Sequence, residues 1–161
     1  MNNDYVIRVA KPSDQDAIFL LVESVYAEYG YEASKTHGEA DLMSLEESYF
    51  DKGGCFWVLE SQAGVIRGAH AALPCNESVC TFRRLYLHGS LRGTSAGQEL
   101  MKITIAWAKE HGFSRIEFWS DTKYQRAHRF FEKFGFTKTD QVRRLHDGLQ
   151  PYQEYFCFLD L

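Results

Sequence analysis

The amino-acid sequence predicts an α/β fold, a mixed central β-sheet with helices on both faces. Two patterns support this prediction: the two-residue alternation of strands and the 3.6-residue periodicity of amphipathic helices. They follow one another in the order β-α-α-β-β-β-α-β-α-β-β. At 161 residues, the chain fits one domain, residues 1–161, long enough to bury a single core.

Strand-like segments recur along the whole chain. Each is short, rich in apolar residues and bounded by turn-forming residues. The expected strands cover residues 5–10, 55–60, 65–73, 79–87, 114–120, 136–145 and 152–161. The turn Ser61-Gln62-Ala63-Gly64 lies between the second and third of them, so these two strands are predicted to form a hairpin.

Two helices are expected in the first third of the chain. Pro12-Ser13-Asp14 opens the first, with Ser13 as its N-cap, and Gly30 ends it. The second is predicted over residues 39–50, because its apolar residues share one helical face. These residues are Leu42, Leu45 and Tyr49.

Two further helices are expected in the second half. The helix over residues 95–111 ends in Lys109, His111 and Gly112, which suit the negative end of the helix dipole and its cap. Gly135 closes the last helix, over residues 124–134. The apolar stripe of the longer helix is predicted to consist of Leu100, Ile103, Ala106 and Trp107.

Composition argues against several classes of partner. The formal net charge of −4 argues against nucleic acid, which is held by excess Lys and Arg. The polar residues 1–4 and the lack of a long apolar run predict neither a signal peptide nor a membrane span. We therefore expect a cytoplasmic protein. Its cysteines show no CxxC spacing, which favours free buried thiols over a metal site: Cys55, Cys75, Cys80 and Cys157.

The run Arg92-Gly93-Thr94-Ser95-Ala96-Gly97-Gln98 follows the strand at residues 79–87 and opens a helix. Free backbone N–H groups, the positive end of a helix dipole and one cation meet there, an arrangement suited to a diphosphate. Adenine nucleotides, dinucleotides and coenzyme A all carry this group, so the loop alone leaves the ligand open.

Two motifs resemble those of the GNAT superfamily of N-acetyltransferases, over essentially the whole chain. The loop from Arg92 to Gly97 is similar to the family's pyrophosphate signature, Arg/Gln-x-x-Gly-x-Gly/Ala. The run Ala127-His128-Arg129-Phe130-Phe131-Glu132-Lys133-Phe134-Gly135-Phe136 is similar to its second signature, an alanine helix ending in Gly-Phe. The resemblance implies a GNAT-type sheet whose fourth and fifth strands splay into a V, with acetyl-CoA as co-substrate and no metal.

The resemblance also implies which residues contact the coenzyme. The loop from Arg92 to Gly97 would wrap the pyrophosphate, with Gln98 in the helix behind it. Backbone groups of Leu85, Tyr86 and Leu87 would pair with the pantetheine arm. Tyr124, Ala127 and Phe131 would line the helix on the far side of the coenzyme.

Four positions depart from the family pattern, one of them Tyr124, which stands where an Asn often opens the second signature. Ser95 replaces the first glycine of the loop, so the loop either avoids a positive φ there or is strained. Phe131 stands where a tyrosine commonly protonates the leaving thiolate, and it has no proton to give. Thr81 stands where many members carry a carboxylate. The usual acid and base positions are therefore both empty.

Three other residues are candidates for this chemistry, each with a structural alternative. Tyr124 is a candidate acid, or an aromatic wall for the coenzyme. Tyr86 points away from Leu85 and Leu87, and it is a catalytic candidate or a core or pocket tyrosine. His70 is a candidate base, or a buried core histidine in mid-strand.

The expected function is transfer of acetyl from acetyl-CoA to a primary amine of a small molecule or an amino-acid or peptide-like acceptor. Attack would be direct, in a ternary complex. The empty acid–base positions motivate an alternative, a non-catalytic module that binds acyl-CoA as a sensor or interaction domain. A homodimer through residues 152–161 is a further expectation.

Overall fold

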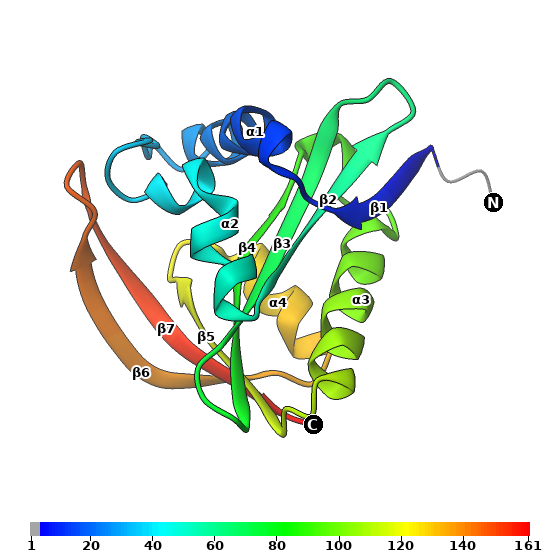
Figure 1. Ribbon diagram of the computed structural model, residues 1–161. Helices are drawn as coiled ribbons and strands as arrows, with labels where there is room; N and C mark the ends of the chain where they lie inside the picture. The colour runs from blue at the N-terminus through cyan, green and yellow to red at the C-terminus, as the bar shows by residue number, and fades with distance from the viewer. Residues whose placement is uncertain (1–3) are drawn as a thin grey trace.

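The computed structural model describes residues 4–161, and residues 1–3 of the polar N-terminal segment lie outside this range. Seven strands form one sheet in the order β1-β2-β3-β4-β5-β7-β6 (Figure 1). Only β4 and β5 pair in parallel, so the prediction of a mixed sheet is confirmed. The strands are β1 Tyr5–Val9, β2 Cys55–Ser61, β3 Ile66–Pro74, β4 Val79–Leu87, β5 Arg115–Asp121, β6 Thr137–His146 and β7 Pro151–Asp160.

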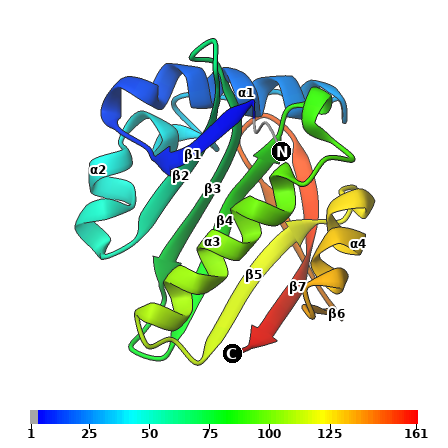
Figure 2. The same ribbon diagram turned by 90° about the vertical axis from the view of Figure 1, so that its right-hand side faces the viewer.

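Helices cover both faces of the sheet, as predicted, and each pair encloses its own core. The first pair, α1 (Gln15–Ala27) and α2 (Leu45–Ser48), lies over one face. The second pair, α3 (Ala96–Glu110) and α4 (Gln125–Lys133), lies over the other, and Figure 2 shows α3 crossing the near side of the sheet. None of the helices in residues 4–161 is long and apolar enough to cross a membrane.

The predicted helix over residues 39–50 is wrong as a single element. The segment consists of a 3-10 turn at Ala40–Met43, the short helix α2 and a second 3-10 turn at Phe50–Lys52. Ser44 interrupts it with φ −148° and ψ 58°, which is not helical. The apolar residues of the predicted face are nevertheless all buried, because three short turns present them to the same core: Leu42, Leu45 and Tyr49.

The predicted N-cap of the first helix is also wrong. Pro12–Asp14 form a 3-10 turn, and Asp14 precedes α1. The Asp14 carboxylate accepts a hydrogen bond from the Lys11 N–H at 2.9 Å and pairs with Arg8 at 2.8 Å. Burial alone would raise the pKa of Asp14, but the hydrogen bonds from Arg8 outweigh it and hold that pKa below its usual range. Asp14 thus ties the 3-10 turn to Lys11 and Arg8, and its side chain makes no capping hydrogen bond to α1.

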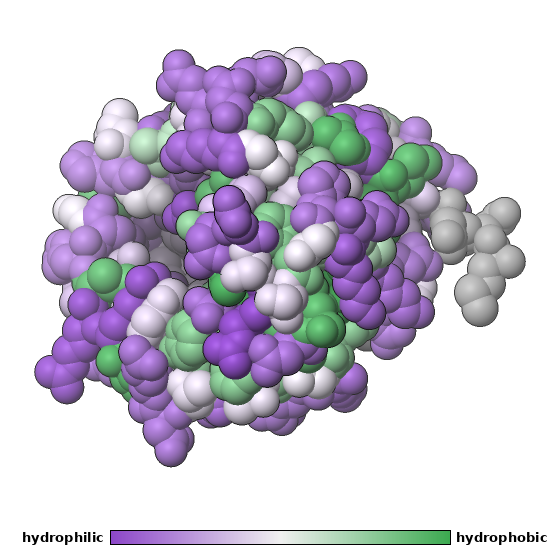
Figure 3. Space-filling view, turned by 60° about the horizontal axis from the view of Figure 1, so that its bottom comes forward, coloured by the Kyte–Doolittle hydropathy of each residue, from purple (hydrophilic) through white to green (hydrophobic). Residues whose placement is uncertain are grey.

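The buried stripe of α3 differs from the predicted one. Leu100 is buried as expected, whereas Ile103 and Ala106 are exposed. The helix is rotated so that Met101, Thr104 and Ala108 face the sheet with Leu100. All four cysteines are free, although Cys75 is exposed rather than buried. Figure 3 shows one face of the molecule, on which hydrophobic patches are broken up by hydrophilic residues.

The sheet opens between β4 and β5. Parallel pairing joins only Val79–Thr81 to Arg115–Glu117, although both strands continue well beyond this point. Past Thr81 the two strands separate, which confirms the V expected between the fourth and fifth strands.

Candidate active site

A β-bulge shapes the β4 side of the V. Ala69 of β3 pairs with Tyr86, and Ala71 pairs with Arg83. Two residues of β4, Arg84 and Leu85, therefore lie opposite the single residue His70. Arg84 has φ 61°, the only positive φ of a non-glycine residue within residues 4–161. For an L-amino acid this left-handed conformation costs about 1–2 kcal/mol.

Hydrogen bonds of the largely buried guanidinium hold Arg84 in this conformation. Its guanidinium donates to the Asp41 carboxylate at 2.5 and 3.1 Å and to the Gly38 carbonyl at 2.8 Å. Burial alone would raise the pKa of Asp41, but the charge and hydrogen bonds of Arg84 hold it below its usual range. Tyr49 also donates to Asp41. The bulge is thus tied to the segment between α1 and α2.

A cavity of about 450 Å³ occupies the V. Its lining residues fall into two groups, which we call the floor and the opening. The floor and the α4 side are lined by His70, Thr81, Phe82, Leu85, Phe118, Ala127 and Phe131. The opening is lined by polar and aromatic residues that include Tyr26, Tyr31, Glu39, Tyr86, Trp119, Asp121, Tyr124 and Tyr152.

Tyrosines from three elements cluster beside the cavity. The hydroxyls of Tyr26 and Tyr86 lie 3.3 Å apart, and the Tyr29 ring packs edge-on against Tyr124 with centroids 4.7 Å apart. Burial raises the pKa values of Tyr26 and Tyr124 above the ordinary tyrosine value, and neighbouring tyrosines add to the effect. These phenols therefore stay protonated at neutral pH.

His70 lies on the cavity floor in the middle of β3. Its side chain is 1% exposed, and its Nδ1 has no hydrogen-bond partner. The ring packs edge-on against Phe82, with centroids 4.9 Å apart. Burial lowers the pKa of His70 to about 3, so the imidazole is neutral at physiological pH.

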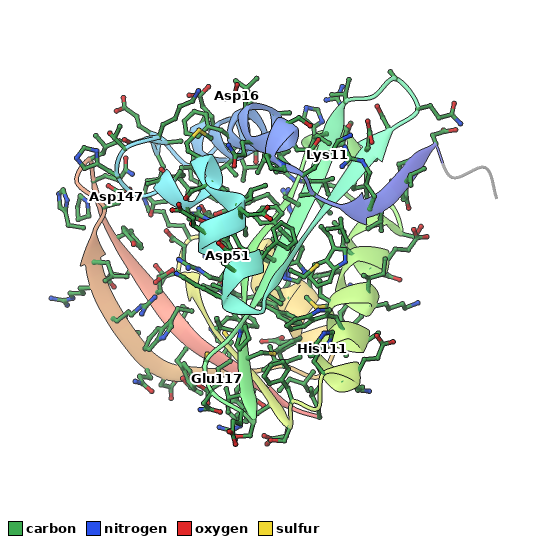
Figure 4. All side chains as sticks on the ribbon, in the orientation of Figure 1. Lys11, Asp16, Asp51, His111, Glu117 and Asp147 are labelled. Atoms are coloured by element: carbon green, nitrogen blue, oxygen red, sulfur yellow. The ribbon has the colours of Figure 1, made fainter. Side chains whose placement is uncertain are left out.

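A strap of two loops crosses the open end of the cavity. The segment after α1 meets the tip of the β6–β7 hairpin, where Asp147 is labelled in Figure 4. Gln150 accepts a hydrogen bond from the Glu32 N–H at 3.0 Å and donates one to the Glu32 carbonyl at 3.1 Å. An ideal Cβ on Gly38 would lie 3.2 Å from Cβ of Asp147, so the two loops are in close contact. Access to the cavity is narrowed on this side.

The start of α3 presents unpaired backbone donors. Within residues 4–161, no protein acceptor takes the N–H groups of Gly93, Ser95, Gly97 and Gln98. Gly93 supplies the positive φ of +77°, whereas Ser95 is right-handed with φ −75°. The loop thus avoids strain at the serine that replaces the family's glycine. Free N–H groups at a helix start form an anion-binding site.

Arg92 of this loop already has a partner in the protein. It pairs with Glu28, just past the end of α1, at 2.6 Å. Both side chains are partly exposed, so this ion pair is weak and can exchange for an anionic ligand.

The predicted site residues fall into two groups in the structure. Around the cavity lie His70, Leu85, Tyr86, Tyr124, Ala127 and Phe131. The remaining predicted residues form the end of β4 and the start of α3, outside the cavity: Leu87, Arg92, Gly93, Thr94, Ser95, Ala96, Gly97 and Gln98. Tyr86 packs on the α1 side of the sheet, opposite Leu85 and Leu87, as the alternation predicted.

Sequence reasoning missed the residues that join the α1–α2 segment to the V. Asp41 gave no signal, because its partner Arg84 is distant in the chain and alternation alone could not reveal the bulge. Trp119 and Asp121 on β5 were also missed. The only available hint was the set of tyrosines and acidic residues near the end of the first helix.

A parallel pair that splays beside a helix start with free N–H groups defines a class of protein, the acetyl-CoA-dependent acyltransferases of GNAT fold. The family comparison agrees: the profile of the acetyltransferase (GNAT) family matches residues 20–136, so the chain belongs to that family.

Curated relatives are N-acetyltransferases. The chain is 30% identical to YjgM, an uncharacterised N-acetyltransferase of Escherichia coli, over 139 residues covering 84% of this chain and 83% of YjgM. It is 28% identical to human N-acetyltransferase 8B over 131 residues, 78% of this chain and 56% of that protein. The chain thus spans little more than half the length of the human relative.

Solved structures share the fold. An acetyltransferase of Streptococcus agalactiae superposes with a TM-score of 0.85 at 18% identity, covering 99% of both chains. The yncA structure of Salmonella typhimurium, solved with acetyl-CoA, has a TM-score of 0.75 at 18% identity, covering 98% of this chain and 94% of that one.

Arg84 offers a test of the bulge. We expect Arg84→Ala to lower the free energy of unfolding by about 3–5 kcal/mol, because it leaves the Asp41 carboxylate without its counter-ion. Arg84→Gly should be roughly 0.5–1 kcal/mol more stable than Arg84→Ala, since glycine adopts a positive φ without steric cost. Urea unfolding measures both variants. An alanine variant as stable as the glycine variant would contradict the strained backbone.

Proposed function

We propose that this protein transfers the acetyl group of acetyl-CoA to a primary amine of a small molecule or an amino-acid or peptide-like acceptor. The observation that carries the proposal is the cavity in the V, together with the free N–H groups at the start of α3, which follows β4 in the chain. The cavity would hold the thioester and the acceptor amine, and the free N–H groups would hold the diphosphate. Family membership supports the same chemistry.

Coenzyme binding would use the predicted loop and the edge of β4. The diphosphate would accept hydrogen bonds from the free N–H groups of Gly93, Ser95, Gly97 and Gln98, with Arg92 as the cation. The amide-bearing arm would run along Leu85, Tyr86 and Leu87, where β4 has left β5 and its backbone edge is free to pair. Ala127 and Phe131 would line the opposite wall.

The reaction is a direct displacement. The amine nitrogen forms a bond to the thioester carbon, the C–S bond breaks, and the electron pair of that bond stays on sulfur. The proton that the amine nitrogen loses balances the one that the thiolate gains. Placing the two reactants in register supplies much of the rate, and a β4 backbone N–H near Leu87 would stabilise the oxyanion.

Tyr124 is our candidate for the acid that protonates the thiolate. It lines the cavity, as Phe131 does, and no group in residues 4–161 takes its hydroxyl proton. Burial raises the pKa of Tyr124, so the phenol is protonated at neutral pH but is a weaker acid than a free tyrosine. Tyr86 is less suited, because its hydroxyl lies 3.3 Å from that of Tyr26 on the α1 side. We assign Tyr86 to the acceptor wall.

Several wider expectations belong to the same proposal. The net charge of −4 favours a soluble acceptor over nucleic acid or a membrane surface, and a cytoplasmic location suits the free cysteines. We also propose one domain that requires no metal and that forms a homodimer. Because β7 lies between β5 and β6 in the sheet, residues 152–161 have no free strand edge for pairing with a second copy.

A second candidate function is binding of acyl-CoA without turnover, as a sensor or interaction module. Phe131 and Thr81 favour it, because both line the cavity and neither supplies an acid or base. Amine-dependent release of thiol from acetyl-CoA discriminates between the two functions. Binding without such release would support the module.

Calorimetry with acetyl-CoA and no acceptor tests the coenzyme site. We expect micromolar binding, weakened by about 1.5–3 kcal/mol in Arg92→Ala through loss of a hydrogen bond to a charged group. Glu28→Gln is the matched control, since it frees Arg92 and should bind at least as tightly as the wild type. Unchanged affinity in Arg92→Ala would mean that the diphosphate lies elsewhere.

Removal of the Tyr124 hydroxyl tests the acid. Tyr124→Phe should lower kcat by about 10²–10⁴-fold at unchanged acetyl-CoA affinity, the usual loss for one acid–base group. Tyr29→Phe is the control, because Tyr29 packs on Tyr124 but does not line the cavity. Phe131→Tyr should restore turnover to the Tyr124→Phe variant. Wild-type rates in Tyr124→Phe would assign the proton to another group or to solvent.

A further inference from the structure

His70 has a buried polar atom for which the protein supplies no partner. The Nδ1 of this residue is the only buried side-chain nitrogen or oxygen within residues 4–161 that lacks a hydrogen bond. Leaving such a group unsatisfied costs about 1–3 kcal/mol, so its presence in a folded core calls for an explanation.

The contacts that His70 makes do not offset the cost of its unsatisfied Nδ1. Its ring packs on Phe82, which contacts Phe136, and Phe136 in turn contacts Phe118 and Phe131. A phenylalanine or leucine at this position would suit such a cluster better than an imidazole. The histidine is therefore poorly explained as a packing residue.

The position of His70 points to a ligand instead. The ring lines the cavity, at the point of β3 that faces the bulge of β4. The protein encloses Nδ1, so the edge of the ring that faces the cavity is the one that carries Nε2. No hydrogen bond within residues 4–161 engages Nε2. A polar group of a molecule on the floor of the V is the partner that this nitrogen lacks.

We propose that His70 is a catalytic residue whose imidazole N–H donates a hydrogen bond to the carbonyl oxygen of the bound thioester. This inference rests on the proposed function and adds a side-chain donor to the β4 backbone N–H. As the amine nitrogen bonds to the carbonyl carbon, negative charge develops on that oxygen, and the hydrogen bond strengthens. His70 keeps its proton when the C–S bond breaks, so no proton passes through it.

A neutral imidazole suits this role and not that of a general base. In its neutral form the ring has one N–H donor, and with a pKa of about 3 it is a weak acceptor of the amine proton. A donor held in an apolar floor is worth more than one in water, because little solvent competes with it. Loss of one oxyanion donor typically costs about 10²–10³-fold in kcat.

Two variants separate catalysis from packing. His70→Phe removes the donor and should lower kcat by about 10²-fold while the thermal midpoint stays equal or rises, since an unsatisfied buried nitrogen is lost. His70→Gln keeps an N–H donor and should retain more activity than His70→Phe. A His70→Phe protein that is destabilised but turns over at the wild-type rate would overturn the proposal.

A binding measurement without an acceptor amine tests the contact between His70 and the thioester carbonyl. In protein labelled with ¹⁵N-histidine, the His70 signals are those missing from His70→Phe. We expect acetyl-CoA to shift the His70 nitrogen that carries the proton, and free CoA, which lacks the carbonyl, to shift it much less. Equal shifts with both ligands, or none while calorimetry shows binding, would refute the contact to the carbonyl oxygen.

The same measurements distinguish this proposal from the function on which it rests. A wild-type protein that acetylates no amine but shows the acetyl-specific shift would refute the proposed reaction and support the His70 contact. Absence of coenzyme binding in calorimetry would overturn both. Full turnover with wild-type rates in His70→Phe would overturn the His70 proposal alone.

Discussion

The ion pair between Arg84 and Asp41 is the interaction on which the rest of the site depends. Arg84 occupies a backbone conformation that is unfavourable for a side chain, and the buried carboxylate offsets that cost. The resulting bulge redirects β4 at the level where its pairing with β5 has already ended. The pair thus ties the α1–α2 segment to the bulge on the β4 side of the V.

This arrangement explains why the predicted second helix is broken. Asp41 must reach Arg84 while Leu42, Leu45 and Tyr49 all remain in the core. In a regular helix over residues 39–50, the direction of the Asp41 side chain would be fixed relative to the directions of these apolar side chains. The non-helical backbone at Ser44 changes the direction of the segment, so that Asp41 contacts Arg84 while Leu45 and Tyr49 remain in the core. Tertiary contacts therefore override the amphipathic pattern, while the burial that this pattern predicted is kept.

Prediction from sequence succeeded for the order of the strands along the chain and for most turns, although the helix over residues 39–50 and the Ser13 N-cap, both read from local patterns, were wrong. Strand order, the hairpin at residues 61–64 and the glycine-rich start of α3 all follow from periodicity or turn chemistry. It failed where partners are distant in the chain, as for Arg84 with Asp41. The rotation of α3, which exposes Ile103, depends on how the helix sits on the sheet, and no local rule sets it. His70 was visible as a mid-strand histidine, but only the structure shows that its Nδ1 is unpartnered.

The candidate acid–base groups around the cavity share one electrostatic property. Burial lowers the pKa of His70 and raises those of Tyr26 and Tyr124, so all three are neutral at physiological pH. These three groups can hold the thioester, orient a neutral amine and stabilise charge as that charge forms, but none of them is suited to take a proton from an ammonium ion. The carboxylates of Glu39 and Asp121 also line the cavity and are proton acceptors by type.

The cavity thus combines neutral donors with carboxylates that lie away from Phe131 and Thr81 in the sequence. Phe131 and Thr81 are the positions at which the family resemblance implies an acid and a carboxylate, and neither side chain is ionisable. The lack of an acid and a base at these two positions would therefore change which groups move protons during acetyl transfer. By itself it does not argue against acetyl transfer.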